Sequence, residues 1–259
     1  MTLDVMSPFR LDDRIVIVTG ASSGLGDRFA RVLHAAGAHV VAAARRTERL
    51  EALAADLGDR ADVVTCDVTS DADCQRLVAS TVERHGRIDV LVNNAGFGEP
   101  MAAEDEPVEH FRQVVDVNLN ALFVLSQLAG RQMIAQGSGV ILNVASMLGL
   151  VASAPIKQAS YCASKGAVVN LTRELAAQWG RKGVRVNAIA PGWFPSEMTA
   201  QMFEGEGSES SLAFVALTCP MARTGEDHEL DGVLLFLAGD ASTYVTGQTI
   251  AVDGGWTAR

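Results

Sequence analysis

The chain has 259 residues, of which 48% are hydrophobic and 20% are charged, and its formal net charge is −10. This composition is ordinary for a globular chain long enough to bury a core. An acidic surface repels phosphate backbones, which argues against a nucleic-acid partner. The segment 1–14 lacks the apolar run of a signal peptide, and no stretch is apolar enough to span a membrane. We therefore expect a soluble, cytoplasmic protein that contacts neither nucleic acid nor membranes.

Strand-like and helix-like segments alternate along most of the chain. Short apolar, β-branched runs predict strands at 15–18, 39–44, 61–66, 90–92, 140–144 and 185–190. Amphipathic segments between them predict helices at 25–36, 47–57, 70–85, 108–136 and 160–181. A late strand is expected at 248–252. This alternation predicts an α/β fold, a Rossmann-type doubly wound parallel sheet with helices on both faces.

Only the segment 193–223 departs from this alternation. It mixes Trp, Phe and Met with two glycines and a Ser/Glu cluster. Long irregular segments in compact domains are usually functional loops, so we expect a substrate lid there. No linker or internal repeat divides the sequence. We therefore predict a single dinucleotide-binding and catalytic domain over 1–259, with its lid at about 193–223.

A glycine-rich turn follows the first predicted strand and opens directly into the first helix. It reads Thr19-Gly20-Ala21-Ser22-Ser23-Gly24-Leu25-Gly26. Glycines allow the backbone to turn tightly beside a pyrophosphate, whose charge is stabilised by the free N–H groups of the helix N-terminus. A purely structural turn is the alternative, but the position between strand and helix favours phosphate binding.

The TGxxxGxG spacing of this turn resembles that of the short-chain dehydrogenase/reductase family, in its compact single-domain branch. The resemblance runs from about Leu11 to Trp256. Its further motifs appear in family order: Asn93-Asn94-Ala95-Gly96, Asn118, Ser146, Tyr161-Cys162-Ala163-Ser164-Lys165, Pro191-Gly192 and Val252-Asp253-Gly254-Gly255. The stretch 191–199 is also similar to gluconate 5-dehydrogenase-like and 3-oxoacyl-carrier-protein-reductase-like members.

Tyr161 and Lys165 are the strongest candidates for chemistry. They are four residues apart, so they share one face of the predicted helix. A free tyrosine titrates near ~10, and a nearby ammonium together with the positive charge of oxidised nicotinamide would lower that pKa. Taken alone, the two residues could also form a surface pair that supports the helix. Ser146 at the end of a central strand, where α/β active sites lie, favours catalysis.

The resemblance implies a role for each of four residues. Tyr161 is the acid/base, and Lys165 lowers its pKa and binds the nicotinamide ribose. Ser146 hydrogen-bonds the substrate oxygen, and Asn118 holds a water that links Lys165 to solvent. The implied reaction is hydride transfer between a nicotinamide and a secondary alcohol or ketone. The 15 positions from Ser146 to Tyr161, with Pro155 between, slightly exceed the family spacing.

The end of the second strand bears on the choice of dinucleotide. In the resemblance, the acidic residue of NAD-dependent members falls on Ala44, and the basic residue of NADP-dependent members falls on Arg45, followed by Arg46. Arginine binds a 2′-phosphate, so NADP(H) is favoured and NAD(H) remains possible. Both arginines could instead be solvated surface residues. The implied cofactor contacts are Gly20, Ser22, Ser23, Gly24, Leu25, Gly26, Arg45, Arg46, Asp67, Val68, Asn94, Ala95, Gly96, Tyr161, Lys165, Pro191, Gly192, Phe194 and Ser196.

No metal site is expected. The five histidines form neither an HExxH motif nor an i,i+4 pair, and the four cysteines include no CxxC pair.

The substrate side is lined in the resemblance by mostly apolar residues: Met147, Leu148, Leu150, Val151, Trp193, Phe194, Met198, Met202, Phe203 and Phe214. Such a lining suits a small-molecule alcohol or ketone with a bulky apolar body. The same residues could simply pack the lid or a subunit contact, and sugar acids and acyl thioesters stay open as substrates.

Two other functions use the same fold. A catalytically silent, dinucleotide-sensing regulator would be expected to lack the Tyr or the Lys, and this chain has both. A lyase or epimerase with the same Tyr–Lys pair would carry a larger C-terminal domain. The resemblance also implies assembly through the helices predicted at 108–136 and 160–181, as a homotetramer or less readily as a dimer.

Overall fold

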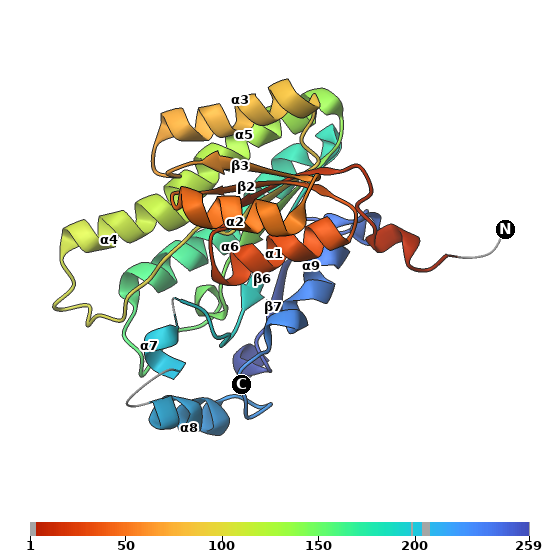
Figure 1. The fold of residues 1–259 in the computed structure, drawn as a ribbon. Helices are drawn as coiled ribbons and strands as arrows, with labels where there is room; N and C mark the ends of the chain where they lie inside the picture. Colours follow the sequence, from red (N-terminus) through yellow and green to blue (C-terminus); the bar gives the residue numbers. More distant parts are fainter. Residues whose placement is uncertain (1–3, 198, 204–207, 259) are drawn as a thin grey trace.

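The computed structural model describes residues 4–197, 199–203 and 208–258. Its centre is a parallel sheet of seven strands in the order β3-β2-β1-β4-β5-β6-β7 (Figure 1). The chain moves outward from β1 to one edge, returns, and then builds the other half from β4. The strands are β1 (Ile15–Thr19), β2 (His39–Ala44), β3 (Ala61–Thr65), β4 (Val90–Asn93), β5 (Gly139–Val144), β6 (Val184–Pro191) and β7 (Thr249–Val252).

Helices cover both faces of the sheet (Figure 1). They are α1 (Gly24–Ala35), α2 (Thr47–Leu57), α3 (Asp71–His85), α4 (Val108–Val115), α5 (Ala121–Gln136), α6 (Ala159–Trp179), α7 (Ala200–Phe203), α8 (Ser208–Thr218) and α9 (Asp231–Ala238). Within the described ranges, no helix has both the length and the apolar character needed to cross a membrane.

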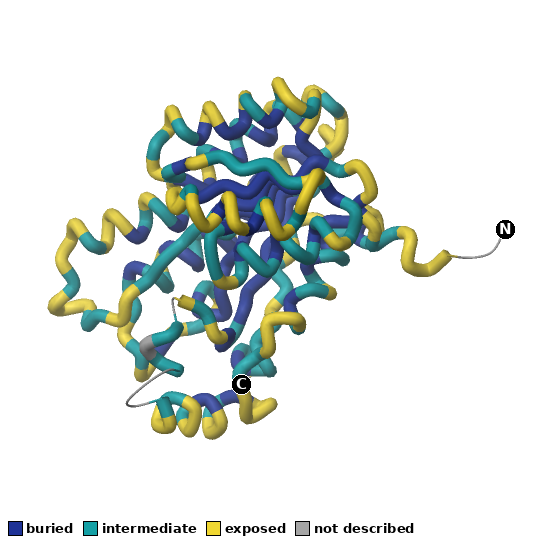
Figure 2. The backbone as a smooth tube through the Cα atoms, in the orientation of Figure 1, coloured by how far each residue is buried: buried dark blue, intermediate teal, exposed yellow. Residues whose placement is uncertain are grey.

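Alternation along β1 shows how the sequence fills two cores. Val16 and Val18 point into one core with Phe29 of α1 and residues of α2 and α9. Ile15 and Ile17 point into the other core, with residues of α3, α5 and α6. Successive side chains of a strand face opposite sides of a sheet, so β1 must be apolar throughout to serve both. Figure 2 shows the buried strands enclosed by helices whose outer surfaces are exposed.

The predicted fold class is confirmed, with three local differences. The helix expected at 108–136 is divided into α4 and α5 by a π-helical segment, Asp116–Asn120, which carries Asn118. The segment 193–223 is less irregular than expected, because it contains α7 and α8. The helix α9 lies where no helix was predicted. Its sequence is apolar nearly throughout, so it lacks the amphipathic period on which the prediction relied.

A chain of buried polar groups crosses the molecule beneath the ends of the central strands. The Nδ2 of Asn93 donates to Ser126 Oγ at 2.9 Å and to Asn143 Oδ1 at 3.0 Å. Asn143 Nδ2 in turn donates to Thr172 Oγ1 at 2.9 Å. These residues lie on α5, β4, β5 and α6. Buried hydrogen bonds of this kind fix geometry, and here they hold α6 against the strand that leads to Ser146.

Candidate active site

The glycine-rich turn is packed tightly against the end of β4. Gly20 has φ +66°, and a Cβ there would lie 2.9 Å from Nδ2 of Asn94. A Cβ on Gly26 would come 2.2 Å from the carbonyl oxygen of Gly20. Neither position accepts a side chain. Thr19 Oγ1 accepts the backbone N–H groups of Asn94 and Ala95 at 3.0 and 3.1 Å, which fixes the turn relative to the Asn-Asn-Ala-Gly motif.

The outer rim of this turn differs from its packed base. Gly24 begins α1 with φ +53°, and a Cβ there would meet only Ser196, at 3.5 Å from its Cβ. Backbone N–H groups at the start of a helix beside such space suit a pyrophosphate. Leu25, one residue on, packs partly buried against the core. The residues therefore fit the dinucleotide expected from the sequence, with Ser196 of the lid on the opposite side.

The motif Pro191-Gly192 is tied to the motif near the C-terminus. Pro191 pairs with Val252 across β6 and β7, and the Gly192 N–H donates to the Val252 carbonyl at 2.9 Å. A Cβ on Gly192 would come 2.5 Å from Cα of Asp253. The two motifs therefore form one packed unit that starts the lid segment.

The two arginines after β2 lie in different environments. Arg46 reaches the glycine-rich turn, donating from Nε to Ser22 Oγ at 3.1 Å and from Nη2 to Ser23 Oγ at 2.5 Å. Arg45 is exposed, and within the described part of the chain its side chain makes no hydrogen bond or ion pair. Ala44 is buried. The structure thus brings Arg46, and not Arg45, to the phosphate side of the cradle.

The segment after β3 is shaped by its own side chains. Asp67 Oδ1 accepts the N–H and the hydroxyl of Thr69, and the Val68 carbonyl accepts the Cys74 thiol at 3.2 Å. Both residues are partly exposed at the carboxyl end of β3, on the same edge as the glycine-rich turn. The structure thus places Asp67 and Val68, two of the expected cofactor contacts, at the carboxyl ends of the strands, where ligands of doubly wound sheets bind.

Tyr161 and Lys165 lie one turn apart on α6, as predicted. Lys165 is buried, and its Nζ donates to the Val144 carbonyl at 2.7 Å and lies 5.7 Å from the ring centroid of Tyr161. Burial lowers the pKa of Lys165 to about 8, and no described carboxylate pairs with it. Burial also raises the pKa of Tyr161, against a smaller effect of its hydrogen bond with Ser146. The chain's own groups therefore do not produce the low tyrosine pKa that the sequence suggested.

Ser146 and Asn118 converge on the same place from other elements. Ser146 follows β5, and its Oγ accepts the Leu148 N–H at 3.1 Å. Asn118 Oδ1 accepts the Phe97 N–H at 2.9 Å, and its Nδ2 donates to the Phe97 carbonyl and to Ser164 Oγ. The structure brings all four predicted catalytic residues together.

A glycine separates Asn118 from Lys165. A Cβ on Gly96 would lie 3.0 Å from Asn118 Oδ1 and 3.4 Å from Lys165 Nζ, so both groups pack closely against this glycine. A neighbouring glycine, Gly98, lies against the ring of Tyr161. Gly98 was not predicted as a site residue. Its one signal in the sequence is that a second glycine lies two residues after the end of the Asn93-Asn94-Ala95-Gly96 motif.

Most of the predicted substrate-side residues form one apolar cluster with Tyr161. Its buried members include Met147, Leu148 and Trp193, and its partly buried members include Val151, Met202, Phe203 and Phe214. Trp256 was not predicted, yet its ring packs edge-on to Trp193 at 5.5 Å. Two predicted residues lie elsewhere: Leu150 is exposed, and Phe194 packs into the core below α1. Met198 lies outside the described residues.

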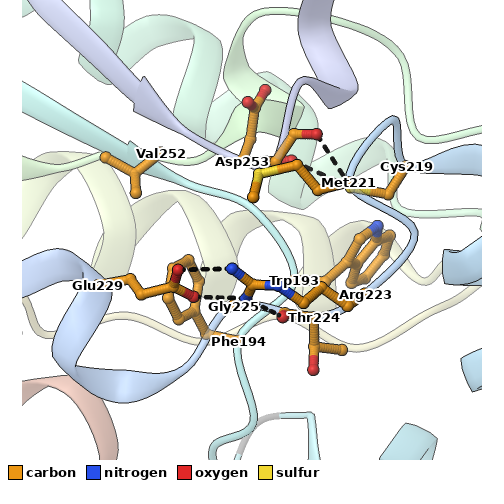
Figure 3. A pocket seen from close by; sticks show the side chains of 11 residues that line it. Trp193, Phe194, Cys219, Met221, Arg223, Thr224, Gly225, Glu229, Val252 and Asp253 are labelled. Atoms are coloured by element: carbon orange, nitrogen blue, oxygen red, sulfur yellow. Dashed lines mark hydrogen bonds and ion pairs between the residues drawn. The ribbon is translucent and has the colours of Figure 1, made fainter.

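A cavity of about 80 Å³ lies beside this cluster, between the lid and the end of β7. Figure 3 shows Trp193, Phe194 and Met221 around it, with Arg223 paired to both oxygens of Glu229. Ser146 and Tyr161 do not line this cavity. The indole N–H of Trp193 is buried and has no hydrogen-bond partner in the described chain. It is therefore an available donor on the lid side of the site.

One group of potential metal ligands occurs far from the cradle. His39, Asp62 and His85 bring their ligand atoms within 4.8 Å of one another. Both histidines hydrogen-bond to Asp62 Oδ2, at 2.9 and 2.7 Å, and Arg84 pairs with the same carboxylate. His39 opens β2, so the group lies toward the amino ends of the strands. No local pattern predicts this group, because its three residues are far apart along the chain.

Comparison with known proteins agrees with this geometry. A family model described as enoyl-(acyl carrier protein) reductase matches residues 20–257. Galactitol 2-dehydrogenase (L-tagatose-forming) of Cereibacter sphaeroides is 41% identical over 256 residues, which cover 98% of this chain and 99% of that protein. A short-chain type dehydrogenase/reductase from Mycobacterium marinum has a TM-score of 0.93 at 35% identity, covering 99% of this chain and 100% of that one. The chain belongs to the short-chain dehydrogenase/reductase family.

Another solved member of the short-chain dehydrogenase/reductase family was crystallised with ligands. It is a gluconate 5-dehydrogenase from Burkholderia cenocepacia in complex with NADP and tartrate, with a TM-score of 0.93 and 35% identity, covering 99% of this chain and 100% of that one. The family, fold class and reaction class expected from the sequence are confirmed. The chain is an NAD(P)-dependent oxidoreductase that acts on a CH–OH group or the matching ketone.

Proposed function

We propose that this oxidoreductase interconverts a secondary alcohol of a small polyol or sugar acid with its ketone, using Tyr161 as the acid/base. The observation that carries the proposal is the convergence of Tyr161, Ser146 and Lys165 at the carboxyl end of β5, beside the glycine-rich cradle. The same set argues against a catalytically silent regulator, which would not need it. A lyase or epimerase reading is weakened by relatives of equal length that are named dehydrogenases.

The chain's own residues handle the proton and the substrate oxygen. In oxidation, the phenolate oxygen of Tyr161 takes the proton of the reacting hydroxyl, while Ser146 Oγ donates a hydrogen bond to the same oxygen. In reduction, Tyr161 returns that proton to the ketone oxygen. Lys165 holds positive charge near the ring, and Asn118 would hold the water that links Lys165 to solvent.

The dinucleotide supplies the hydride acceptor or donor and, when oxidised, a positive charge on the nicotinamide. That charge would add to the charge of Lys165 and lower the pKa of Tyr161, which burial raises in the protein without a dinucleotide. The glycine-rich turn, Asp67-Val68, Asn94 to Gly96, Pro191-Gly192, the Phe194 backbone and Ser196 would hold the dinucleotide. NADP(H) is favoured over NAD(H), because Arg46 lies over Ser22 and Ser23.

Two observations support a hydroxylated substrate over a purely apolar one. The relatives described above are named for galactitol and gluconate. Within the chain, the buried indole N–H of Trp193 lacks a partner, and a substrate hydroxyl would satisfy it at little cost. The apolar cluster around Tyr161 then serves to exclude water and to pack the lid.

The chain would form one catalytic domain over 1–259, with a substrate lid at about 193–223, and it would act in the cytoplasm. A depression of about 350 Å³ on α5 and α6 is lined by Phe123, Leu171, Leu175 and Trp179. Tyr244, in the segment that leads into β7, is a second large side chain that is fully exposed. Apolar side chains exposed at these two separate places favour a homotetramer over a dimer.

The test is a substrate panel with the purified chain. NADP⁺ or NADPH would be mixed with polyols, sugar acids, apolar secondary alcohols and 3-oxoacyl thioesters, and nicotinamide absorbance would be followed. We expect turnover of a polyol or sugar acid, or of the matching ketone. Turnover confined to apolar alcohols or acyl thioesters would contradict the substrate proposal, and no turnover with any hydroxyl or keto compound would contradict the catalytic one.

A further inference from the structure

Glu197 connects the lid to the adenosine end of the dinucleotide site. It lies between β6 and α7, and its neighbour Ser196 is the residue that faces Gly24 across the cradle. Its Oε2 accepts Arg46 Nη1 at 2.9 Å, and its Oε1 accepts a short hydrogen bond from Nη1 of Arg49. Arg49 is in the first turn of α2. One carboxylate from the lid therefore bridges two arginines that follow β2.

The carboxylate of Glu197 is bound by two arginines, as a phosphate group would be. Arg46 simultaneously holds Ser22 and Ser23 of the glycine-rich turn, so its guanidinium is already oriented toward the cradle. Hydrogen bonds from Arg49 first, and also from Arg46 and Ser23, lower the pKa of Glu197 to about 2 against an opposing effect of burial. Glu197 is consequently an anion at neutral pH, and it uses an arginine donor that a 2′-phosphate would require.

We propose that Glu197 is a specificity-determining residue for the dinucleotide: it competes with the 2′-phosphate of NADP(H) for Arg46, while Arg49 holds the Glu197 carboxylate in place. NAD(H) carries no 2′-phosphate and leaves the Glu197 contacts in place, with the lid tied to α2. NADP(H) binds only if its 2′-phosphate displaces Glu197 from Arg46 or shares Arg46 with it. In the second case the phosphate lies beside the like charge of the Glu197 carboxylate. Glu197 therefore reduces the preference for NADP(H) over NAD(H) that Arg46 creates. The inference rests on the dinucleotide site of the proposed function.

The expected size of the effect follows from exposure. The side chains of Glu197, Arg46 and Arg49 are 50%, 43% and 52% exposed, so solvent and salt screen their charges. Exposed ion pairs contribute modestly, and removing the competing charge should change affinity about three- to tenfold. The effect should shrink with added salt, because the repulsion between two exposed anions is screened.

The direct test is titration calorimetry of NADP⁺ and NAD⁺ with the parent and with Glu197→Gln. We expect the Kd for NADP⁺ to fall about three- to tenfold, while the Kd for NAD⁺ changes less than about twofold. Glu209→Gln on α8 is the matched control, since Glu209 is an exposed lid carboxylate without an arginine partner in the described chain, and it should change neither Kd. Equal changes for both dinucleotides, or no change for NADP⁺, would overturn the proposal.

A double-mutant cycle tests whether Glu197 acts through Arg46. In an Arg46→Ala background, Glu197→Gln should lose most of its effect on the Kd for NADP⁺, because the contested donor is gone. An undiminished effect would show that Glu197 acts elsewhere and would contradict the mechanism. Failure of the parent to bind either dinucleotide would instead refute the proposed function, so the two failures are distinguishable.

Discussion

Gly98 and Tyr161 are in contact at a distance that permits no side chain on the glycine. A Cβ built on Gly98 would lie 2.4 Å from Cδ2 of the Tyr161 ring and 2.9 Å from its Cγ. Atoms this close cannot coexist, so a residue larger than glycine at this position must displace the ring or the loop. The loop that follows β4 therefore helps to set the position of the phenol.

Replacing Gly98 with Ala should lower kcat by roughly a hundredfold, because a shift of about 1 Å in a catalytic group can cost that much. The Kd for the dinucleotide should stay near the parent value, since the cradle is not touched. Gly232→Ala on α9 is the control, as a Cβ there meets nothing within 4 Å. Steady-state kinetics with parallel calorimetry would check this, and an unchanged kcat for Gly98→Ala would contradict it.

The two arginines after β2 should contribute unequally to NADP(H) binding. Arg46→Ala should raise the Kd for NADPH about ten- to a hundredfold, because a charge-assisted hydrogen bond contributes ~1.5–3 kcal/mol. Arg45→Ala should have a smaller effect, since that side chain points to solvent without a partner in the described chain. Fluorescence titration of both variants decides between them. A larger loss of affinity from Arg45→Ala would show that Arg45, the residue at the family's position, binds the 2′-phosphate, and that Arg46, the residue in contact with the glycine-rich turn, does not.

The buried Lys165 should make stability depend on pH. Its folded pKa of about 8 lies below the ordinary 10.5, so between these values the unfolded chain binds the extra proton. The free energy of unfolding should therefore rise with pH from about 8 to 10, by up to about 3 kcal/mol. The raised pKa of Tyr161 opposes this only at higher pH. Urea unfolding of the parent and of Lys165→Met would test it, and equal slopes for the two would contradict the prediction.

The buried polar chain beneath the site should matter for stability. Thr172→Val leaves the Nδ2 of Asn143 without its 2.9 Å acceptor, which should cost about 1–3 kcal/mol of unfolding free energy. Thr81→Val is the matched control, because that buried hydroxyl donates only to the Leu77 carbonyl of its own helix. Its cost should be below about 1 kcal/mol. Similar losses for the two variants in urea titrations would argue against a special role for the polar chain.

The fold was largely predictable because β1 to β6 and the helices between them carry local periodicity. The bounds of β2 agree with the prediction, and those of α2 do as well. The helix α9 was not predicted because its own residues are apolar on nearly all of its faces, so no amphipathic period marks it. The helices α7 and α8 were missed because the glycines and serines near them resemble a loop, and α8 has little separation of polar from apolar faces.

The site residues that lie within short sequence motifs could be predicted. The spacing of Tyr161 and Lys165 predicted that they share one face of a helix, and the resemblance to the short-chain dehydrogenase/reductase family added Ser146 and the roles of all three. Contacts between distant segments were not predictable: Glu197 meets Arg46 across 151 positions, and Trp256 reaches Trp193 from the C-terminus. The position of Arg46, and not Arg45, over the glycine-rich turn also depends on how the end of β2 leads into α2. Such pairings follow from the folded topology, which a local pattern does not contain.

The central claim is that the Tyr161 hydroxyl carries the proton during hydride transfer. It is tested most directly by replacing Tyr161 with Phe and measuring both nicotinamide absorbance kinetics and the Kd for the dinucleotide. Loss of a general acid/base typically lowers the rate by about 10²–10⁴-fold, and we expect a loss in that range with a Kd within about threefold of the parent. Activity of Tyr161→Phe within about tenfold of the parent would contradict the account, since that is less than an acid/base of this kind contributes.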